Sequence, residues 1–150
     1  MDEPTNEILG VWVTIGVVVF AAIVLVLIIR WIIRKVRQPD LLGMSKEDIQ
    51  KRWREIESLT SRNDEMSYKL AVMEADKLLD HALKSMGFGG NTLGERLKLA
   101  CYRFPRLRKV WRAHLLRNKL VHEASFHLSR GAAQGAIGQF KNALKELSVL

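Results

Sequence analysis

One uninterrupted hydrophobic run stands near the start of the chain. Positions 8–29 hold no charged residue, and a helix of that length extends roughly 33 Å, enough to cross a hydrocarbon core of about 30 Å. Trp12 and Trp31 lie near the ends of the run, as indole rings at a membrane interface do. We therefore expect a transmembrane helix over 8–33, contacting lipid from Ile8 to Ile33, after a short segment, 1–7, outside the cell.

The charges on either side of this run predict its orientation. Acidic residues precede it, and Arg30, Arg34, Lys35 and Arg37 follow it. Basic residues favour the cytoplasmic side, and a cleavable signal peptide would instead begin with basic residues and have a shorter apolar run. The pattern predicts a retained single-pass anchor in the plasma membrane, a basic juxtamembrane linker over 34–44, and a cytoplasmic domain over 45–150.

Helical periodicity resumes after Pro39 and Gly43. Ser45, with Asp48 three residues later, is typical of a helix start, and Ile49, Trp53 and Ile56 then recur at helical spacing. This narrow apolar stripe either docks on the rest of the domain or lies on the membrane surface.

Four further helices are predicted, and no strand pattern is found. The second runs from about Asp64 to Met86, and a capping box of Thr92 and Glu95 opens the third. Pro105 either ends that helix or begins the next. The second helix carries Met66, Leu70, Met73, Leu79, Leu83 and Met86, and its methionines are expected to fill the core. The fourth holds Leu107, Val110, Trp111, His114, Leu115 and Val121. The last is expected to bury Ala133, Ile137, Phe140, Leu144 and Leu147 on one side. The fold class is therefore all-α: one transmembrane helix followed by a bundle of four or five helices.

Composition narrows the chemistry. With 150 residues the chain is too short for an enzyme with a separate cofactor domain, and its single cysteine, Cys101, excludes an internal disulfide. No Cys and His residues have metal-ligand spacing, so we expect neither a metal nor a cofactor. The net charge of +8 favours an anionic partner, either nucleic acid or anionic lipid.

The positive charge is concentrated in one stretch. Every charged residue from Arg96 to Lys119 is basic. We call five of them the basic stripe and expect them to bind nucleic acid or another anion: Arg106, Arg108, Lys109, Arg112 and Lys119. A solvated face, or a surface against anionic lipid, would show the same composition.

The hexapeptide RNKLVH at 117–122 lies within this stretch. Arg117 can donate two aligned hydrogen bonds to a phosphate, and His122 can transfer a proton near neutral pH. A guanidinium on the phosphate and an imidazole for the ribose 2′-hydroxyl are the minimum for RNA cleavage without a metal. Asn118 is then expected to orient His122, and the three residues are the predicted catalytic set.

The motif and its surroundings resemble the HEPN superfamily of helical nucleotide-binding and ribonuclease domains. The resemblance rests on AVMEADKLLD at 71–80, TLGERLK at 92–98 and VWRAHLLRNKLVHE at 110–123. It is closest to small bacterial members carried behind a membrane anchor. In the nuclease members it implies a homodimer that cuts RNA without a metal, with the residues at Arg117 and His122 of both chains lining one cleft, whereas other branches bind without cutting. An antitoxin or regulatory protein would be a further partner of a toxin. Unlike the toxin members, this chain has an acid, Glu123, directly after the histidine.

Helix geometry adds three supporting residues. Arg117 and His122 are about 140° apart around a regular helix, whereas His114 shares a face with Asn118 and His122. The motif residues therefore converge only if the helix bends or ends between them, or if two chains combine. Asp76 and Asp80, four residues apart, would repel unless a cation lies between them, and we expect Arg112 or Arg117 there; a solvated pair with Asp80 bonded to Lys84 is the alternative.

Three functions remain. The first is a membrane-anchored, HEPN-like endoribonuclease that acts as a homodimer. The second is a non-catalytic interaction or nucleotide-binding module on the same bundle, in which Arg117 and His122 are structural. The third is a sensor of anionic lipid headgroups driven by the basic stripe.

Overall fold

The computed structural model describes residues 3–36, 44–123 and 125–150, and within the first helix it describes the side chains of 12–13 and 15–31. The chain divides into two compact units, Met1–Gln38 and Pro39–Leu150. Every regular element among the described residues is helical, which confirms the all-α prediction.

The first unit contains a single helix, α1 (Glu3–Val36). The prediction of a membrane-spanning helix ahead of a bundle is not supported, because no helix of the described part of the chain is long and apolar enough to cross a bilayer. Most of the predicted linker, 37–43, lies outside the described residues.

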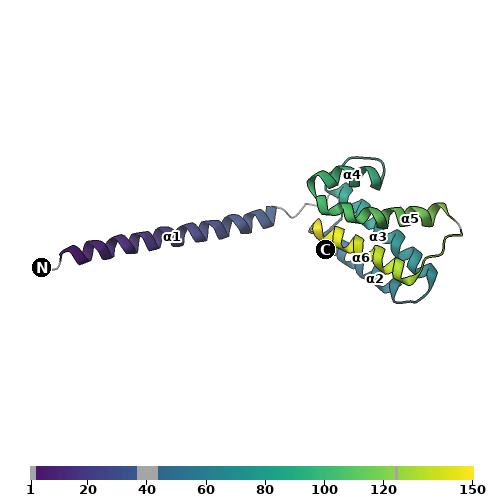
Figure 1. Cartoon of the computed structure of the whole chain (residues 1–150), viewed down its shortest axis with the longest axis horizontal. Helices are drawn as coiled ribbons and strands as arrows, with labels where there is room; N and C mark the ends of the chain where they lie inside the picture. The colour runs from purple at the N-terminus through teal and green to yellow at the C-terminus, as the bar shows by residue number, and fades with distance from the viewer. Residues whose placement is uncertain (1–2, 37–43, 124) are drawn as a thin grey trace. The chain divides into compact units, whose positions relative to one another are not determined.

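The second unit is a helical bundle (Figure 1). Its elements are α2 (Lys46–Thr60), α3 (Glu65–Ser85), α4 (Leu93–Arg103), the 3₁₀ helix η1 (Pro105–Val110), α5 (Trp111–His122) and α6 (Arg130–Glu146). Helix α3 contacts α2, α4, α5 and α6, so it is the centre of the bundle. The residues that face α4 and α5 from α3 are consequently held on a firmly packed element.

Side-chain caps define where the helices begin. Ser45 and Asp48 form the predicted capping box of α2, and the Asp64 carboxylate caps α3 by accepting from the Ser67 N–H at 2.8 Å. Thr92 caps α4 by accepting from the Glu95 N–H, but the Glu95 carboxylate accepts from the Asn91 N–H rather than from that of Thr92. The reciprocal box predicted at α4 is thus displaced by one residue.

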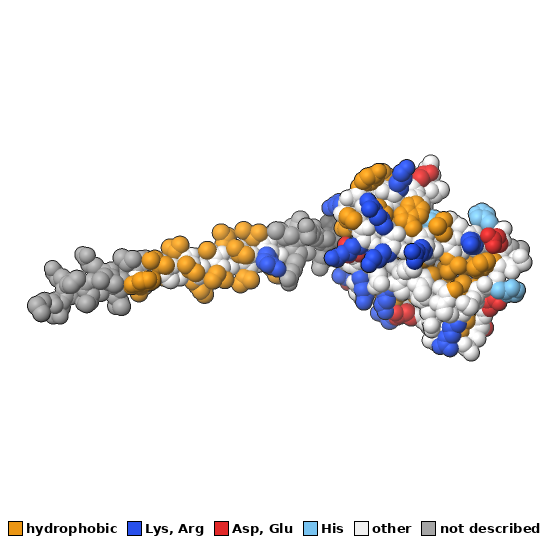
Figure 2. Space-filling model, in the orientation of Figure 1, with side chains coloured by type: hydrophobic (Ala, Val, Ile, Leu, Met, Phe, Trp, Pro, Cys, Tyr) orange, Lys and Arg blue, Asp and Glu red, His pale blue; other side chains and the backbone are white. Residues whose placement is uncertain are grey.

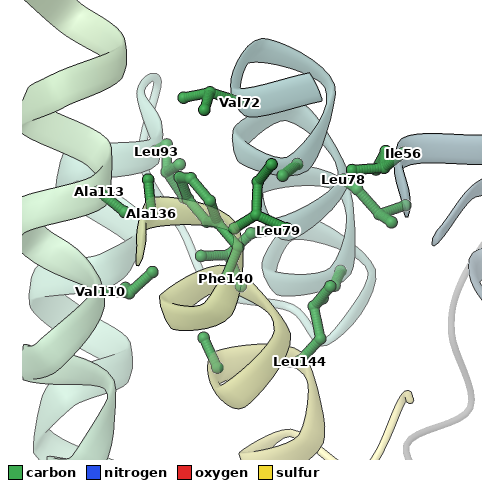
Figure 3. Packing of buried hydrophobic residues seen from close by; sticks show 14 of the residues in the cluster. Ile56, Val72, Leu78, Leu79, Leu93, Val110, Ala113, Ala136, Phe140 and Leu144 are labelled. Atoms are coloured by element: carbon green, nitrogen blue, oxygen red, sulfur yellow. The ribbon is translucent and has the colours of Figure 1, made fainter. Parts of the chain in front are cut away.

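The core lies between α3, α6 and the elements around them. Phe140 of α6 and Leu79 of α3 are fully buried and point into the same space (Figure 3). Ile49, Trp53 and Ile56 are also buried in this core, so the apolar stripe of α2 docks on the domain. All five apolar positions predicted for α6 are buried: Ala133, Ile137, Phe140, Leu144 and Leu147.

Two helices differ from their predicted apolar faces. In α3, Met66, Leu70 and Met73 are exposed, because they share one side of the helix while Val72, Leu79 and others on another side meet the core. The predicted fourth helix is split at Trp111 into η1 and α5. Leu115 and Val121 of α5 are exposed as well.

Candidate functional site

A cleft of about 700 Å³ opens between α3, the start of α4 and α5. Its lining includes all six residues predicted to act in or support catalysis: Asp76, Asp80, His114, Arg117, Asn118 and His122. The other lining residues are Met73, Glu74, Lys77, Thr92, Leu93 and Gly94. The candidate residues of α3 and α5 therefore meet at one cleft within a single chain.

Asp76 is the most connected residue of this cleft. Its side chain is 4% exposed, and its two oxygens contact two different residues of α5. Oδ1 lies 2.7 Å from Nδ1 of His114, and Oδ2 lies 3.2 Å from Nε of Arg117. Because His114 is itself buried, the carboxylate fixes the imidazole and the guanidinium relative to each other and ties α3 to α5.

Asn118 links the same two residues from the other side. Its Oδ1 accepts a hydrogen bond from Nη1 of Arg117 at 3.2 Å, and its Nδ2 lies 3.4 Å from Nε2 of His114. The predicted orienting role of Asn118 was toward His122, yet the described contact is with His114. The ring of His114 also meets the edge of Trp111, with centroids 6.0 Å apart, as a satisfied buried histidine would.

Asp80 has a different arginine from the predicted one. Arg96 of α4 donates to both of its oxygens, from Nε at 2.8 Å and from Nη2 at 3.2 Å. The remaining guanidinium N–H groups reach the carbonyls of Gly90 and Asn91. The Asp80 carboxylate raises the pKa of Arg96 above its usual value. The expectation of one arginine between the two aspartates is therefore half right: Arg117 pairs with Asp76, and Asp80 takes Arg96 instead of Arg112 or Lys84.

His122 occupies the last position of α5 and is exposed. It lines the same cleft as Arg117 although the two lie about 140° apart around the helix. Both residues reach the cleft because the cleft covers a broad side of α5. His114 and Asn118, which lie between Arg117 and His122 around the helix, also line it. No bend of the helix and no second chain is needed to place both residues at one cleft.

The basic stripe does not line this cleft. All five of its residues are exposed, and Lys and Arg side chains gather on the face of the domain shown in Figure 2. Arg112 and Lys119 lie about 100° to 160° around α5 from His114 and Asn118, given about 100° per residue. Arg106 and Lys109 line a separate cavity of about 210 Å³ beside α6, where Arg106 pairs with Glu146 at 3.4 Å. The stripe is thus a surface feature separate from the cleft.

Sequence reasoning missed the wall that α4 contributes. Gly94 is the second residue of that helix, and a Cβ placed on it would lie 3.6 Å from Nε2 of His114. The lack of a side chain at this position leaves the imidazole open to the cleft. The capping signal at Thr92 predicted the helix start, but nothing in the sequence indicated that this start would face His114.

Among the residues described, no cluster of His, Cys, Asp and Glu could hold a metal ion. Comparisons of the chain with protein-family models, curated proteins and solved structures find no match.

Proposed function

We propose that this protein is a HEPN-like endoribonuclease that cuts RNA at the cleft between α3, α4 and α5 without a metal. Arg117 stabilises the charge that develops on the phosphate, and His122 transfers a proton. Asn118 and Asp76 hold the guanidinium in place. The resemblance of the motif residues makes a homodimer part of this proposal.

The observation that carries the proposal is the shared lining of one open cleft by Arg117, Asn118 and His122. The Arg117 side chain is about one third exposed, so its guanidinium is held by Asp76 yet still reachable from solvent. His122 is exposed and has no hydrogen bond or ion pair to another described residue, which leaves both ring nitrogens available to a ligand. A phosphodiester in the cleft would meet a fixed cation and a free imidazole together.

The test is incubation of the purified full-length chain with RNA in EDTA. We expect cleavage by the wild type and a loss of about 100-fold or more in His122→Ala, a typical effect of removing a proton-transfer group. His127→Ala is the matched control, because His127 is exposed but pairs with Glu65 away from the cleft. RNA left intact by the wild type, or cut equally fast by His122→Ala, would contradict the proposal.

A second candidate is a non-catalytic module that binds a nucleotide in the same cleft. The observation in its favour is the burial of Asp76 and His114, which tie α3 to α5 as structural residues do. On this account a nucleoside monophosphate binds the wild-type chain, measured by calorimetry, while RNA stays intact.

A further inference from the structure

The hydrogen bonds around His114 define which of its ring nitrogens carries the proton. Arg117 can only donate, so the Asn118 amide must turn its oxygen toward Arg117 and its NH₂ group toward His114. Nε2 of His114 then faces a donor and holds a lone pair. Its Nδ1 faces the Asp76 carboxylate, which only accepts, so Nδ1 carries the hydrogen.

We infer that His114 is a second catalytic histidine, whose Nε2, positioned by Asp76, accepts the proton of the ribose 2′-hydroxyl. This inference rests on the proposed function, and it assigns the step to a residue outside the Arg-Asn-x-x-x-His motif. A buried carboxylate that holds Nδ1–H and leaves Nε2 as the base is the arrangement that orients imidazoles in hydrolytic triads. Only a weak 3.4 Å contact with Asn118 has to be replaced by the hydroxyl.

The position of His114 along α5 also suits a reaction that moves two protons. His114 and His122 lie on either side of Arg117 and Asn118, four residues from Asn118 in each direction. Nε2 of His114 reaches toward Asn118, and long side chains at helix positions such as 122 lean back toward the N-terminus. Along the helix axis His114 therefore lies before Arg117 and His122 after it, and all three residues line the cleft.

The proposed cleavage step transfers the phosphorus from the 5′-oxygen to the 2′-oxygen within the RNA, and its bonds and protons balance. Nε2 of His114 takes the proton of the 2′-hydroxyl while that oxygen bonds to the neighbouring phosphorus. The bond from phosphorus to the 5′-oxygen breaks with its electron pair, and the His122 imidazolium gives the departing oxygen a proton. The products are a 2′,3′-cyclic phosphate and a 5′-hydroxyl, and both imidazoles return to their starting forms by proton exchange with water.

Gly94 offers a way to block His114 without removing it. An alanine methyl there would make ordinary contact with Nε2 at 3.6 Å, and its other nearest contacts, at 3.8 and 3.9 Å, are equally unstrained. Gly94 lies in a helix, where alanine is intrinsically favoured over glycine. Gly94→Ala should therefore cover the base while the fold stays intact.

The experiment compares full-length variants on two substrates, RNA and a mixture of the four nucleoside 3′-(4-nitrophenyl phosphates). Nitrophenolate leaves without a proton, so the ester needs a base but no acid. We expect His114→Asn, which keeps an N–H near the position of Nδ1, to slow both substrates by about 100- to 10,000-fold. Gly94→Ala should also slow both at an unchanged melting temperature. His122→Ala should slow RNA cleavage, whereas on the ester it should regain most of the rate that it loses on RNA.

Gly135→Ala is the matched control, because a Cβ at this α6 position meets only open space. A wild-type chain that cleaves neither substrate removes the proposed function and this assignment together. If the wild type cleaves RNA, a wild-type rate on either substrate in His114→Asn overturns the assignment alone. His114→Asn could also lose activity because it misfolds. In that case a wild-type rate in Gly94→Ala overturns the assignment of His114 as the base.

Discussion

At the scale of single residues, Asp76 is the side chain on which the cleft most depends. Replacing it with Asn removes the charge that pairs with Arg117 and leaves one acceptor oxygen for two donors, Nε of Arg117 and Nδ1–H of His114. Because the Arg117 side chain left behind is one third exposed, we expect Asp76→Asn to lower the free energy of unfolding by about 1–3 kcal/mol, the cost of losing buried hydrogen bonds, measured in urea. Glu74→Gln, two residues away and paired with Lys77 at 3.8 Å, should change it by less than about 1 kcal/mol.

A second readout separates positioning from stability in the same variant. In the wild type, ¹⁵N NMR of the His114 ring should show a protonated Nδ1 and an unprotonated Nε2. The amide introduced by Asp76→Asn can donate a hydrogen bond to Nδ1, so the tautomer with the proton on Nε2 should become populated. An unchanged tautomer in Asp76→Asn would contradict the positioning role of Asp76.

The sequence predicted the residues of the cleft better than it predicted their partners. The spacing of Asp76 and Asp80 required a cation, and Arg117 fills that role for Asp76. The arginine for Asp80 comes from α4, sixteen residues along the chain. Helical periodicity shows which residues share a face of one helix, but the packing of α4 on α3 that selects Arg96 is a tertiary contact with no local signal.

At the scale of elements, Arg96 holds the start of α4 on α3. Arg96 is 7% exposed, and its guanidinium donates to Asp80 and to the carbonyls of Gly90 and Asn91. A lysine at this position cannot reproduce the two-point contact, so we expect Arg96→Lys to lower the free energy of unfolding by about 1–3 kcal/mol. Thermal or urea unfolding would measure this. The exposed Arg112→Lys is the control, and an equal effect in both variants would refute the role of Arg96.

The N-terminus of α3 gives the domain a specific acid sensitivity. The Lys69 ammonium, the backbone N–H of Leu128 and His127 lower the pKa of Glu65 from 4.5 to about 2. A carboxylate with a lowered folded-state pKa contributes stability above its unfolded value, and this contribution is lost as the pH falls from about 4.5 to about 2. We expect Glu65→Gln to be less stable than the wild type at pH 6 and to lose less stability on acidification through that range.

Melting temperatures measured between pH 6 and pH 2 test this prediction. Glu55→Gln, on the exposed side of α2, should follow the wild-type profile. A Glu65→Gln profile parallel to that of the wild type would show that the contacts of Glu65 do not matter for acid stability.

Helix existence was easier to predict than helix faces and ends. Capping residues at Ser45, Asp64 and Thr92 are local signals, and helices begin beside all three. The apolar face of α3 was misassigned at Met66, Leu70 and Met73, because several sides of this central helix carry apolar residues and only packing selects among them. Pro105 predicted a break, but not the 3₁₀ turns that follow it.

At the scale of the whole molecule, the cleft and the basic stripe are separate parts of one charged domain. The stripe was predicted to bind nucleic acid or another anion, and none of its five residues is among those that line the cleft. The predicted membrane span likewise came from hydropathy alone, and the described helices do not support it. Composition along the chain indicates what kinds of residue are present, whereas their grouping in space depends on which helices pack together.

The central proposal is that RNA is cut in the cleft by attack of its own ribose 2′-hydroxyl oxygen on the neighbouring phosphorus. The most direct test is mass spectrometry of the ends produced when the full-length chain cuts an RNA oligonucleotide in EDTA. The account predicts 2′,3′-cyclic phosphate and 5′-hydroxyl ends, and no cut at a position where the ribose is replaced by 2′-deoxyribose. Ends bearing a 5′-phosphate, or cutting at the 2′-deoxy position, would contradict it.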